Sequence, residues 1–223
     1  MTNSYDRRFP KVTDRALDDL RKRIDVKIEN TLEPWCHEAT RDNIRHYAHG
    51  IGDDNPLWCD PEYAKGTNHG DIVALPSFLF SCSRIISGYV GGLPGVHAMW
   101  AGADWTWHKW VRRNEKISTE AWLKDLIEHD TRFSGRAVQQ IYHVKFYNQD
   151  GDLLSEADSW CFRTDRDFAR EEGTKYKSLK SKEQKRYTPE ALSEIYALYR
   201  DEEIRGATPR YWEDVSVNDE LPT

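Results

Sequence analysis

The chain has 223 residues, of which 38% are hydrophobic and 31% charged, and its formal net charge is -6. This length allows one domain of ordinary size with appendages, or two small domains. The acidic balance argues against a nucleic-acid partner, and no apolar run approaches the roughly 20 residues that cross a bilayer. The first residues lack the apolar stretch of a secretory signal, so we expect a cytoplasmic protein with no membrane partner and with its four cysteines as free thiols.

The N-terminal part of the chain is predicted to be helical. Residues 13–28 repeat apolar side chains at helical spacing behind a polar cap, within an extension that covers residues 1–34. Thr40 is the cap of a second, short helix. Residues 52–64 are rich in Asp, Asn and Pro, which predicts an ordered loop with a turn of helix after Pro61.

A nearly continuous apolar stretch covers residues 71–87. Pro76 divides it, because proline interrupts both a strand ladder and the interior of a helix. The stretch therefore predicts a short strand followed by a buried helix that starts near Ser77. An isolated hydrophobic helix of this kind is buried most simply by an antiparallel sheet that curls around it.

Such a sheet is predicted from the segments that follow. Residues 138–147 mix β-branched and aromatic side chains and partly alternate, and residues 153–163 form the return strand after the turn signal Asn-Gln-Asp-Gly-Asp. Residues 96–110 and 116–128 supply further strands. The central domain is therefore placed at residues 35–165.

The last part of the chain, residues 166–223, changes in composition. Its first twenty or so residues are highly charged and poor in aliphatic side chains, which is typical of a solvated linker. A final helix is predicted with Thr188 as its cap and Pro189 at its first position, and it should stop at Gly206.

The main candidate site is the stretch from Tyr47 to Trp58, Tyr-Ala-His-Gly-Ile-Gly-Asp-Asp-Asn-Pro-Leu-Trp. It combines a short helix, a turn that glycines make flexible and two adjacent carboxylates. Asp53, held on a rigid turn beside an apolar helix, is a candidate general base, because burial raises the pKa of a carboxyl group toward neutrality. The alternative is an Asx turn in which the aspartates only bind nearby amides, and the residues alone favour this alternative.

This stretch resembles the signature of the type-2 enoyl-CoA hydratases, Gly-Asp-x-Asn-Pro-Leu/Ile/Val-His. Five of its six defined positions match, at Gly52, Asp53, Asn55, Pro56 and Leu57. More weakly, the central domain is similar to the N-terminal hotdog half of two-hotdog MaoC-like dehydratases. The closing residues 210–223 resemble the start of the second hotdog in such chains.

The resemblance implies an α+β hotdog fold, in which an antiparallel sheet wraps around a central helix, here with N-terminal and C-terminal helical extensions. It implies a lyase that adds water to an enoyl thioester or removes it, with acyl-CoA or an acyl-carrier thioester as substrate and with no cofactor or metal. In such enzymes an Asp and a His position the water, which assigns acid/base catalysis to Asp53 and the ordering of the loop to Asn55. Backbone N–H groups near Ser77, at the start of the central helix, would polarise the thioester carbonyl.

The chain departs from the signature at the His position, which is Trp58. An indole has one N–H donor and cannot accept a proton at neutral pH, so half of the acid/base pair is missing. A His-Gly pair that the resemblance places near the central helix reads Pro76-Ser77. The chain therefore resembles the degenerate hotdog of a pair, which shapes the acyl pocket with residues such as Trp58, Pro76 and Ser77.

Other candidate residues lie outside the motif. His97 is a candidate for the missing imidazole, although a hydrogen-bonded structural histidine is the favoured alternative. Trp100 belongs to a cluster of tryptophans that either lines an acyl pocket or packs in the core or a dimer interface; Trp105 and Trp107, two residues apart, share one strand face. Arg84 is a candidate for binding coenzyme A phosphates, with a solvated surface position as the alternative. The histidines and carboxylates do not repeat at metal-ligand spacing.

Three functions remain open. The first is a substrate-shaping hotdog that pairs with a catalytic hotdog carrying the full Asp/His motif. The second is a self-sufficient hydratase or hotdog thioesterase that uses Asp53 with His97 or another base. The third is a non-catalytic acyl-CoA-binding or assembly module. The retained motif favours the first two and Trp58 favours the first, with a homodimer or a hetero-oligomer with a second hotdog subunit as the expected assembly.

Overall fold

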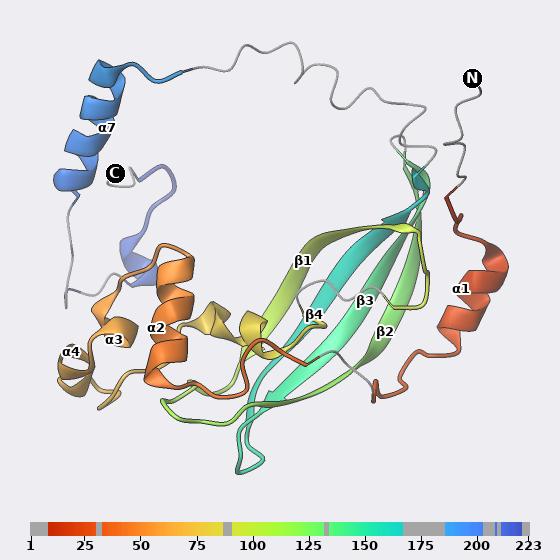
Figure 1. The fold of residues 1–223 in the computed structure, drawn as a ribbon, viewed down its shortest axis with the longest axis horizontal. Helices are drawn as coiled ribbons and strands as arrows, with labels where there is room; N and C mark the ends of the chain where they lie inside the picture. Colours follow the sequence, from red (N-terminus) through yellow and green to blue (C-terminus); the bar gives the residue numbers. More distant parts are fainter. Residues whose placement is uncertain are drawn as a thin grey trace, which may run out of the picture. The chain divides into compact units, whose positions relative to one another are not determined.

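The computed structural model describes residues 9–29, 33–86, 91–131, 134–166, 186–202, 208 and 211–219. The chain forms two compact units, Met1–Gly173 and Thr174–Thr223, and each is described by itself. The first unit contains a sheet of long strands together with several short helices, and the second contains an α-helix (Figure 1).

One antiparallel sheet dominates the first unit. Its strands are β1 (His97–Trp107), β2 (Ser118–Thr131), β3 (Gly135–Tyr147) and β4 (Leu153–Thr164). Their order across the sheet is β1-β4-β3-β2, so β1 and β2 form the two edges (Figure 1). The predicted antiparallel sheet and α+β class are thereby confirmed, and each predicted strand segment coincides with one of these strands apart from shifts at the ends.

One face of the sheet contributes to the core. Along β3, Val144 and Phe146 are buried, whereas His143 and Lys145, which alternate with them, are only partly buried. A period of two is what a strand with one covered face requires, because successive side chains point to opposite faces. The apolar residues of these strands therefore determine which face receives the helix described next.

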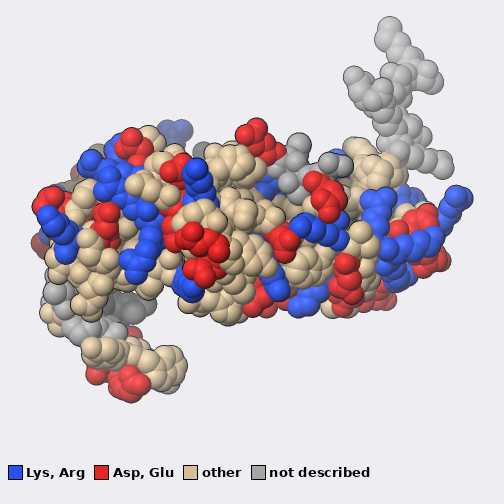
Figure 2. Space-filling view, turned by 90° about the horizontal axis from the view of Figure 1, so that it is seen from below, with Lys and Arg blue, Asp and Glu red and all other residues tan. Residues whose placement is uncertain are grey.

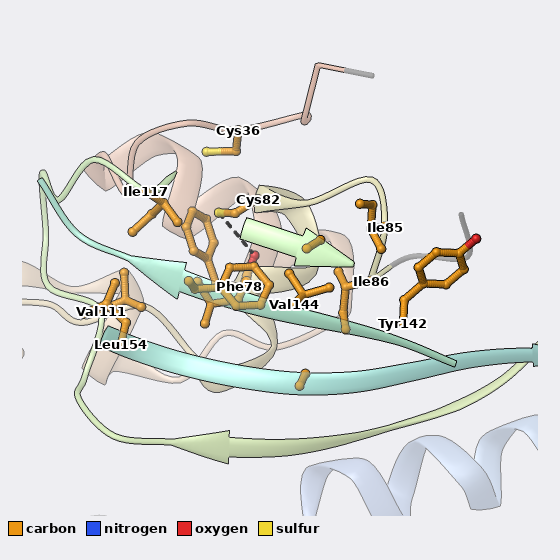
Figure 3. Close-up of a cluster of buried hydrophobic side chains, with 14 of the residues drawn as sticks. Cys36, Phe78, Cys82, Ile85, Ile86, Val111, Ile117, Tyr142, Val144 and Leu154 are labelled. Atoms are coloured by element: carbon orange, nitrogen blue, oxygen red, sulfur yellow. Dashed lines mark hydrogen bonds between the residues drawn. The ribbon is translucent and has the colours of Figure 1, made fainter. Parts of the chain in front are cut away.

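The predicted buried helix is present as a 3-10 helix, η1 (Pro76–Cys82). It begins one residue before Ser77, the predicted start. Figure 3 shows Phe78 of η1 in the same cluster of buried side chains as Val144 of β3 and Leu154 of β4. The apolar stretch is therefore buried against the sheet, as its composition predicts.

The helix is shorter than the apolar stretch that contains it. The hydroxyl of Ser81 donates to the carbonyl of Phe78 (2.6 Å), and Ser83 already has extended backbone angles. Local side-chain bonds of this kind compete with continuation of a helix. The short strand expected before the helix is reduced to an isolated bridge between Val73 and Arg112.

The helix predicted over residues 13–28 is shorter than expected. It forms α1 (Asp14–Arg21), and the prediction of helix for the residues beyond it is wrong. There the chain extends along β2, where Ile24 forms a parallel bridge with Leu123. Ile24 and Ile28 still pack against the core, but they do so from extended backbone. An available strand edge outweighed the helical spacing, because β-branched side chains suit a pleated, half-buried surface.

Three short helices follow: α2 (Arg41–Gly50), α3 (Pro56–Cys59) and α4 (Pro61–Lys65). The side chain of Thr40 accepts a hydrogen bond from the N–H of Asn43 (3.2 Å), which confirms the predicted cap of α2. The predicted turn of helix after Pro61 is α4, whereas α3 lies within the stretch predicted to be a loop.

The second unit contains α7 (Pro189–Arg200) and a 3-10 turn, η2 (Trp212–Asp214). Thr188 caps α7 as predicted, since its hydroxyl accepts from the N–H of Ala191 (3.2 Å). The helix ends at Arg200, before the predicted stop at Gly206, which lies outside the described residues. Most of the predicted charged linker lies outside them as well.

Charges of both signs are mixed on one face of the molecule. On the face shown in Figure 2, Lys and Arg side chains are interspersed with Asp and Glu side chains. Two such pairs, Arg21–Glu128 (2.5 Å) and Lys27–Glu120 (2.6 Å), connect the N-terminal segment to β2. Exposed pairs contribute about 0–1 kcal/mol each, so they orient this segment more than they stabilise it. No described helix is long and apolar enough to cross a membrane.

A buried arginine fixes the loop that leads into β1. Arg163, near the end of β4, is 1% exposed. Its guanidinium donates to the side-chain oxygen of Gln140 (2.8 Å) and to the carbonyls of Leu93 (2.5 Å) and His97 (3.3 Å). Burial lowers the pKa of Arg163. Its hydrogen bonds therefore hold the backbone before β1 against the sheet.

The substitution Arg163→Met should lower the free energy of unfolding by about 2–4 kcal/mol, because each buried acceptor left without a donor costs about 1–3 kcal/mol. Urea denaturation measures the change. Arg136→Met is the matched control, since Arg136 makes surface ion pairs with Glu128 and Asp14 and should change stability by less than about 1 kcal/mol. Equal losses for the two variants would contradict the role given to Arg163.

Candidate functional site

The predicted motif lies on the turn between α2 and α3. Gly52 has a φ of 79°, in the left-handed region that suits glycine, and the N–H of Asp53 donates back to the carbonyl of Ala48 (2.9 Å). Oδ1 of Asp53 accepts from the N–H of Asn55 (3.0 Å), and Oδ1 of Asn55 accepts from the N–H of Leu57 (2.9 Å). These are the bonds of the predicted Asx turn, and through them Asn55 orders the loop and caps α3.

Trp58, at the signature's His position, lies in α3. Its side chain is partly buried and packs against the core. The indole Nε1 is buried and has no hydrogen-bond partner among the described residues. Such an N–H costs about 1–3 kcal/mol until an oxygen satisfies it. Trp58 therefore keeps an unsatisfied buried donor among the described residues, and it cannot accept a proton.

An apolar pocket of about 360 Å³ lies between the start of η1 and the end of β1. η1 contributes Pro76 and Leu79, and the chain at the end of β1 contributes Trp107, Trp110 and Val111. The indole N–H of Trp107 donates to the carbonyl of Pro76 (3.3 Å), which connects the two walls. Of the two predicted substrate-binding residues at the start of η1, Pro76 lines this pocket. Ser77, the next residue, is not among the residues that line it.

Aromatic rings continue from this pocket along β1. Trp105 and Trp107 stack with centroids 5.6 Å and planes 9° apart, which confirms that they share a strand face. Phe80 of η1 contacts Trp105 (5.0 Å) and Trp100 (6.0 Å). The indole N–H of Trp100 donates to the hydroxyl of Ser159 (3.0 Å), while the residue stays 46% exposed. Sequence reasoning missed Phe80, whose only signal was its place in the apolar stretch.

The candidate phosphate-binding cations take part in defined interactions. Arg84, the predicted phosphate ligand, lies over the ring of Trp35, 3.9 Å from its centroid. Lys109 lines the apolar pocket and pairs with Asp152 (2.9 Å), and this contact holds the pKa of the Asp152 carboxyl below its usual value. Lys109 and Arg112 also line an adjoining, more polar cavity of about 370 Å³. Glu115 and Asp152 line the same polar cavity, so its two cations face two carboxylates.

His97 lies far from the pocket. It is the exposed first residue of β1, whereas Trp107 is the last. A strand of 11 residues spans roughly 33 Å, and Figure 1 shows the α2–α3 turn toward the Trp107 end. Within one chain the structure brings Pro76 and Trp107 together, but it does not bring His97 to Asp53 or to the pocket.

A second group of titratable side chains lies on the sheet face opposite η1, and no motif pointed to it. Nδ1 of His143 is 2.7 Å from Oδ1 of Asp158, and its Nε2 is 3.3 Å from Glu156. Burial opposes ionisation of Asp158, but hydrogen bonds from Lys124 and His143 hold its pKa below the usual value. Within the described ranges, no cluster of three or more His, Cys, Asp or Glu is arranged to hold a metal ion.

The sequence of this chain matches a known protein family. A model described as the FAS1-like, dehydratase domain region matches residues 28–157, which include the α2–α3 turn, η1 and the pocket. The chain belongs to this dehydratase family. The predicted resemblance to hydratases and dehydratases of this type is thereby confirmed for the family.

Two relatives in sequence are UPF0336 proteins of actinobacteria. The chain is 30% identical to one from Parafrankia sp. over 127 residues, which cover 53% of this chain and 79% of that protein. It is 39% identical to one from Streptomyces avermitilis over 54 residues, which cover 24% of this chain and 36% of that protein. The match to the Streptomyces protein therefore spans only about a third of its length.

Two solved structures share the fold. The ChsH1–ChsH2 complex from Mycobacterium tuberculosis superposes with a TM-score of 0.51 and 17% identity, covering 68% of this chain and 90% of the matched chain. A MaoC-like dehydratase superposes with a TM-score of 0.52 and 16% identity, covering 66% of this chain and 44% of that one. The predicted hotdog fold is confirmed by this likeness.

Asn55→Ala should destabilise the protein by about 1 kcal/mol, because it removes the cap of α3. Asn55→Asp is the matched control, since a carboxylate oxygen can accept the same hydrogen bond from Leu57, and it should cost far less. Thermal unfolding followed by circular dichroism compares the two variants. If both lose stability equally, the bond from Asn55 to Leu57 does not order this loop.

Proposed function

We propose that this chain is the substrate-shaping hotdog of an acyl-thioester hydratase or dehydratase, of the enoyl-CoA type, and that it works with a second hotdog carrying the complete Asp/His pair. The observation that carries the proposal is Trp58. It occupies the signature's His position, and its buried indole N–H lacks a partner among the described residues. The motif around it keeps its turn geometry, so the loop is retained while one acid/base group is lost.

The chemistry explains why this loss matters. Hydration of a 2-enoyl thioester forms a C–O bond at the β-carbon, transfers one proton from the water to a base and delivers a proton to the α-carbon. Dehydration reverses these steps. Asp53 is a group that can exchange a proton, whereas an indole cannot do so at neutral pH. The His97 imidazole is distant within the chain, so we assign the complete proton relay to the partner hotdog.

The pocket supports a role in shaping the substrate. Its walls, formed by Leu79, Trp107 and Trp110, are apolar and suit an acyl chain. Lys109 and Arg112 line the adjoining polar cavity together with Glu115 and Asp152, and we assign the phosphates of coenzyme A or of a carrier-protein arm to these two cations. Pro76 joins the two walls through its carbonyl. We therefore place the acyl group against η1 and the phosphates near Lys109.

The edge of the sheet supports a second hotdog as partner. β1 is an edge strand and exposes Met99, Trp100 and Trp107, and unpaired edges favour association with another strand. One matched structure is described as a complex of two chains. This chain also covers only 44% of the matched MaoC-like dehydratase, as expected for one half of a longer arrangement.

The isolated chain should show little or no hydration of crotonyl-CoA. A hotdog subunit that carries an intact Gly-Asp-x-Asn-Pro-Leu-His motif should restore turnover when it is added. Loss of the ultraviolet absorbance of the conjugated enoyl thioester measures the rate, and size-exclusion chromatography with light scattering measures the association. A monomer that hydrates crotonyl-CoA fully on its own would overturn the proposal.

Two substitutions separate shaping from catalysis in the reconstituted pair. Trp110→Ala should raise KM by at least about tenfold, because it removes an apolar wall of the acyl pocket, while Asp53→Asn should leave kcat within about threefold. Positioned proton transfer contributes roughly 100- to 10,000-fold. A loss of that size in Asp53→Asn would therefore assign acid/base chemistry to this chain and favour the self-sufficient enzyme.

A further inference from the structure

Two cysteines outside the proposed site meet where the segment before α2 crosses η1. The N–H of Cys36 donates to the carbonyl of Ser81 (3.1 Å), the residue before Cys82. Backbones joined in this way lie about 5 Å apart, so Cys36 and Cys82 lie on adjacent segments. A disulfide spans about 4.4–6.8 Å between α-carbons. Figure 3 shows the two cysteines on these neighbouring segments.

The two sulfur atoms have different surroundings. Sγ of Cys36 accepts a hydrogen bond from the side-chain amide of Asn43 (3.2 Å). The Cys36 thiol also donates to the carbonyl of Glu38 (3.0 Å), and the Cys82 thiol donates to the carbonyl of Phe78 (4.0 Å). The nearby Cys82 side chain lowers the pKa of Cys36, and Cys36 in turn raises the pKa of Cys82. The thiolate is the nucleophile in thiol chemistry, so Cys36 is the sulfur that reacts first. Cys82 is then the neighbouring thiol that can resolve the product.

The other two cysteines provide a contrast within the same chain. Burial raises the pKa of both Cys59 and Cys161. Cys36 is 9% exposed and follows Trp35, which is 60% exposed. Cys82 is 2% exposed, so Cys36 is the member of the pair nearer the surface.

We propose that Cys36 and Cys82 are a redox-active pair, which hydrogen peroxide converts to an intramolecular disulfide. The Cys36 thiolate attacks one peroxide oxygen, so that an S–O bond forms, the O–O bond breaks and hydroxide leaves. That hydroxide takes up the proton lost by Cys36. The Cys82 sulfur then attacks the Cys36 sulfur, and the hydroxyl group leaves with the Cys82 proton as water. In total, two thiols and one peroxide give one disulfide and two waters.

The position of the bond gives it an effect on the fold. The loop closed between residues 36 and 82 contains α2, α3 and α4, and with them the whole motif from Gly52 to Trp58. A closed loop of this length restricts the unfolded chain strongly. The oxidised protein should therefore unfold at a higher temperature than the reduced protein. This inference does not depend on the proposed hydratase function.

Peptide mapping of the full chain tests the pair directly. The reduced protein is treated with hydrogen peroxide, free thiols are blocked with N-ethylmaleimide, and a non-reducing tryptic digest is analysed by mass spectrometry. The four cysteines fall in separate tryptic peptides, residues 28–41, 46–65, 66–84 and 146–163. We expect peptides 28–41 and 66–84 joined with the loss of two hydrogens, and maleimide on Cys59 and Cys161. Another pairing, or maleimide on all four cysteines, would overturn the proposal.

Two variants assign the roles within the pair. In Cys82→Ala, the sulfenic acid formed at Cys36 has no resolving thiol, so it should be trapped by dimedone. The matched control, Cys59→Ala with Cys161→Ala, should form the disulfide as the wild type does and show the same rise in Tm on oxidation. Failure of this control to form the bond would contradict the pairing. Dimedone labelling of Cys82 in Cys36→Ala as fast as that of Cys36 in Cys82→Ala would contradict the assignment of Cys36 as the reactive sulfur.

Discussion

Burial of η1 against one face of the sheet is the contact on which the first unit depends. A 3-10 helix of seven residues has little stability of its own, so packing must hold it. Phe78 provides that packing beside Val144 and Leu154. With the helix fixed there, Phe80 meets the tryptophans of β1 and the carbonyl of Pro76 meets the indole of Trp107. The pocket therefore takes its position from the core.

Much of this architecture is accessible from local sequence, because its signals are local. Alternation marked the strands, and Thr40 and Thr188 marked two helix starts through side chains that bind amides three residues away. The failures arose where distant contacts decide. The isoleucines after α1 have helical spacing, yet they pair with β2, and no local pattern reports that an edge strand is within reach. The shortening of η1 likewise depends on serine side chains competing with the helix.

In the candidate site, too, the features that depend on nearby residues were predictable and those that depend on distant contacts were not. The bonds of Asp53 and Asn55 join residues two positions apart, so the motif alone predicted the turn. The pocket joins residues about thirty positions apart, Pro76 and Trp107, and nothing in the spacing indicated that pairing. His97 was a candidate because it lies in the same predicted strand as the tryptophans. It is the first residue of that strand and Trp107 is the last, so the two residues lie in different parts of the unit. The group around His143 arises from cross-strand register, which the sequence does not specify.

The two edge strands of the sheet, β1 and β2, differ in whether another segment pairs with them. The segment after α1 is hydrogen-bonded to part of β2, whereas β1 pairs only with β4 in the described part of the first unit. A sheet with both edges open can add copies at each end and grow into a fibril. Where the β2 edge is covered, two subunits that pair through their β1 edges leave no open β1 edge. Growth then stops at two subunits. The N-terminal extension thus covers part of the β2 edge, and under the proposed pairing the β1 edge is the one that receives the partner.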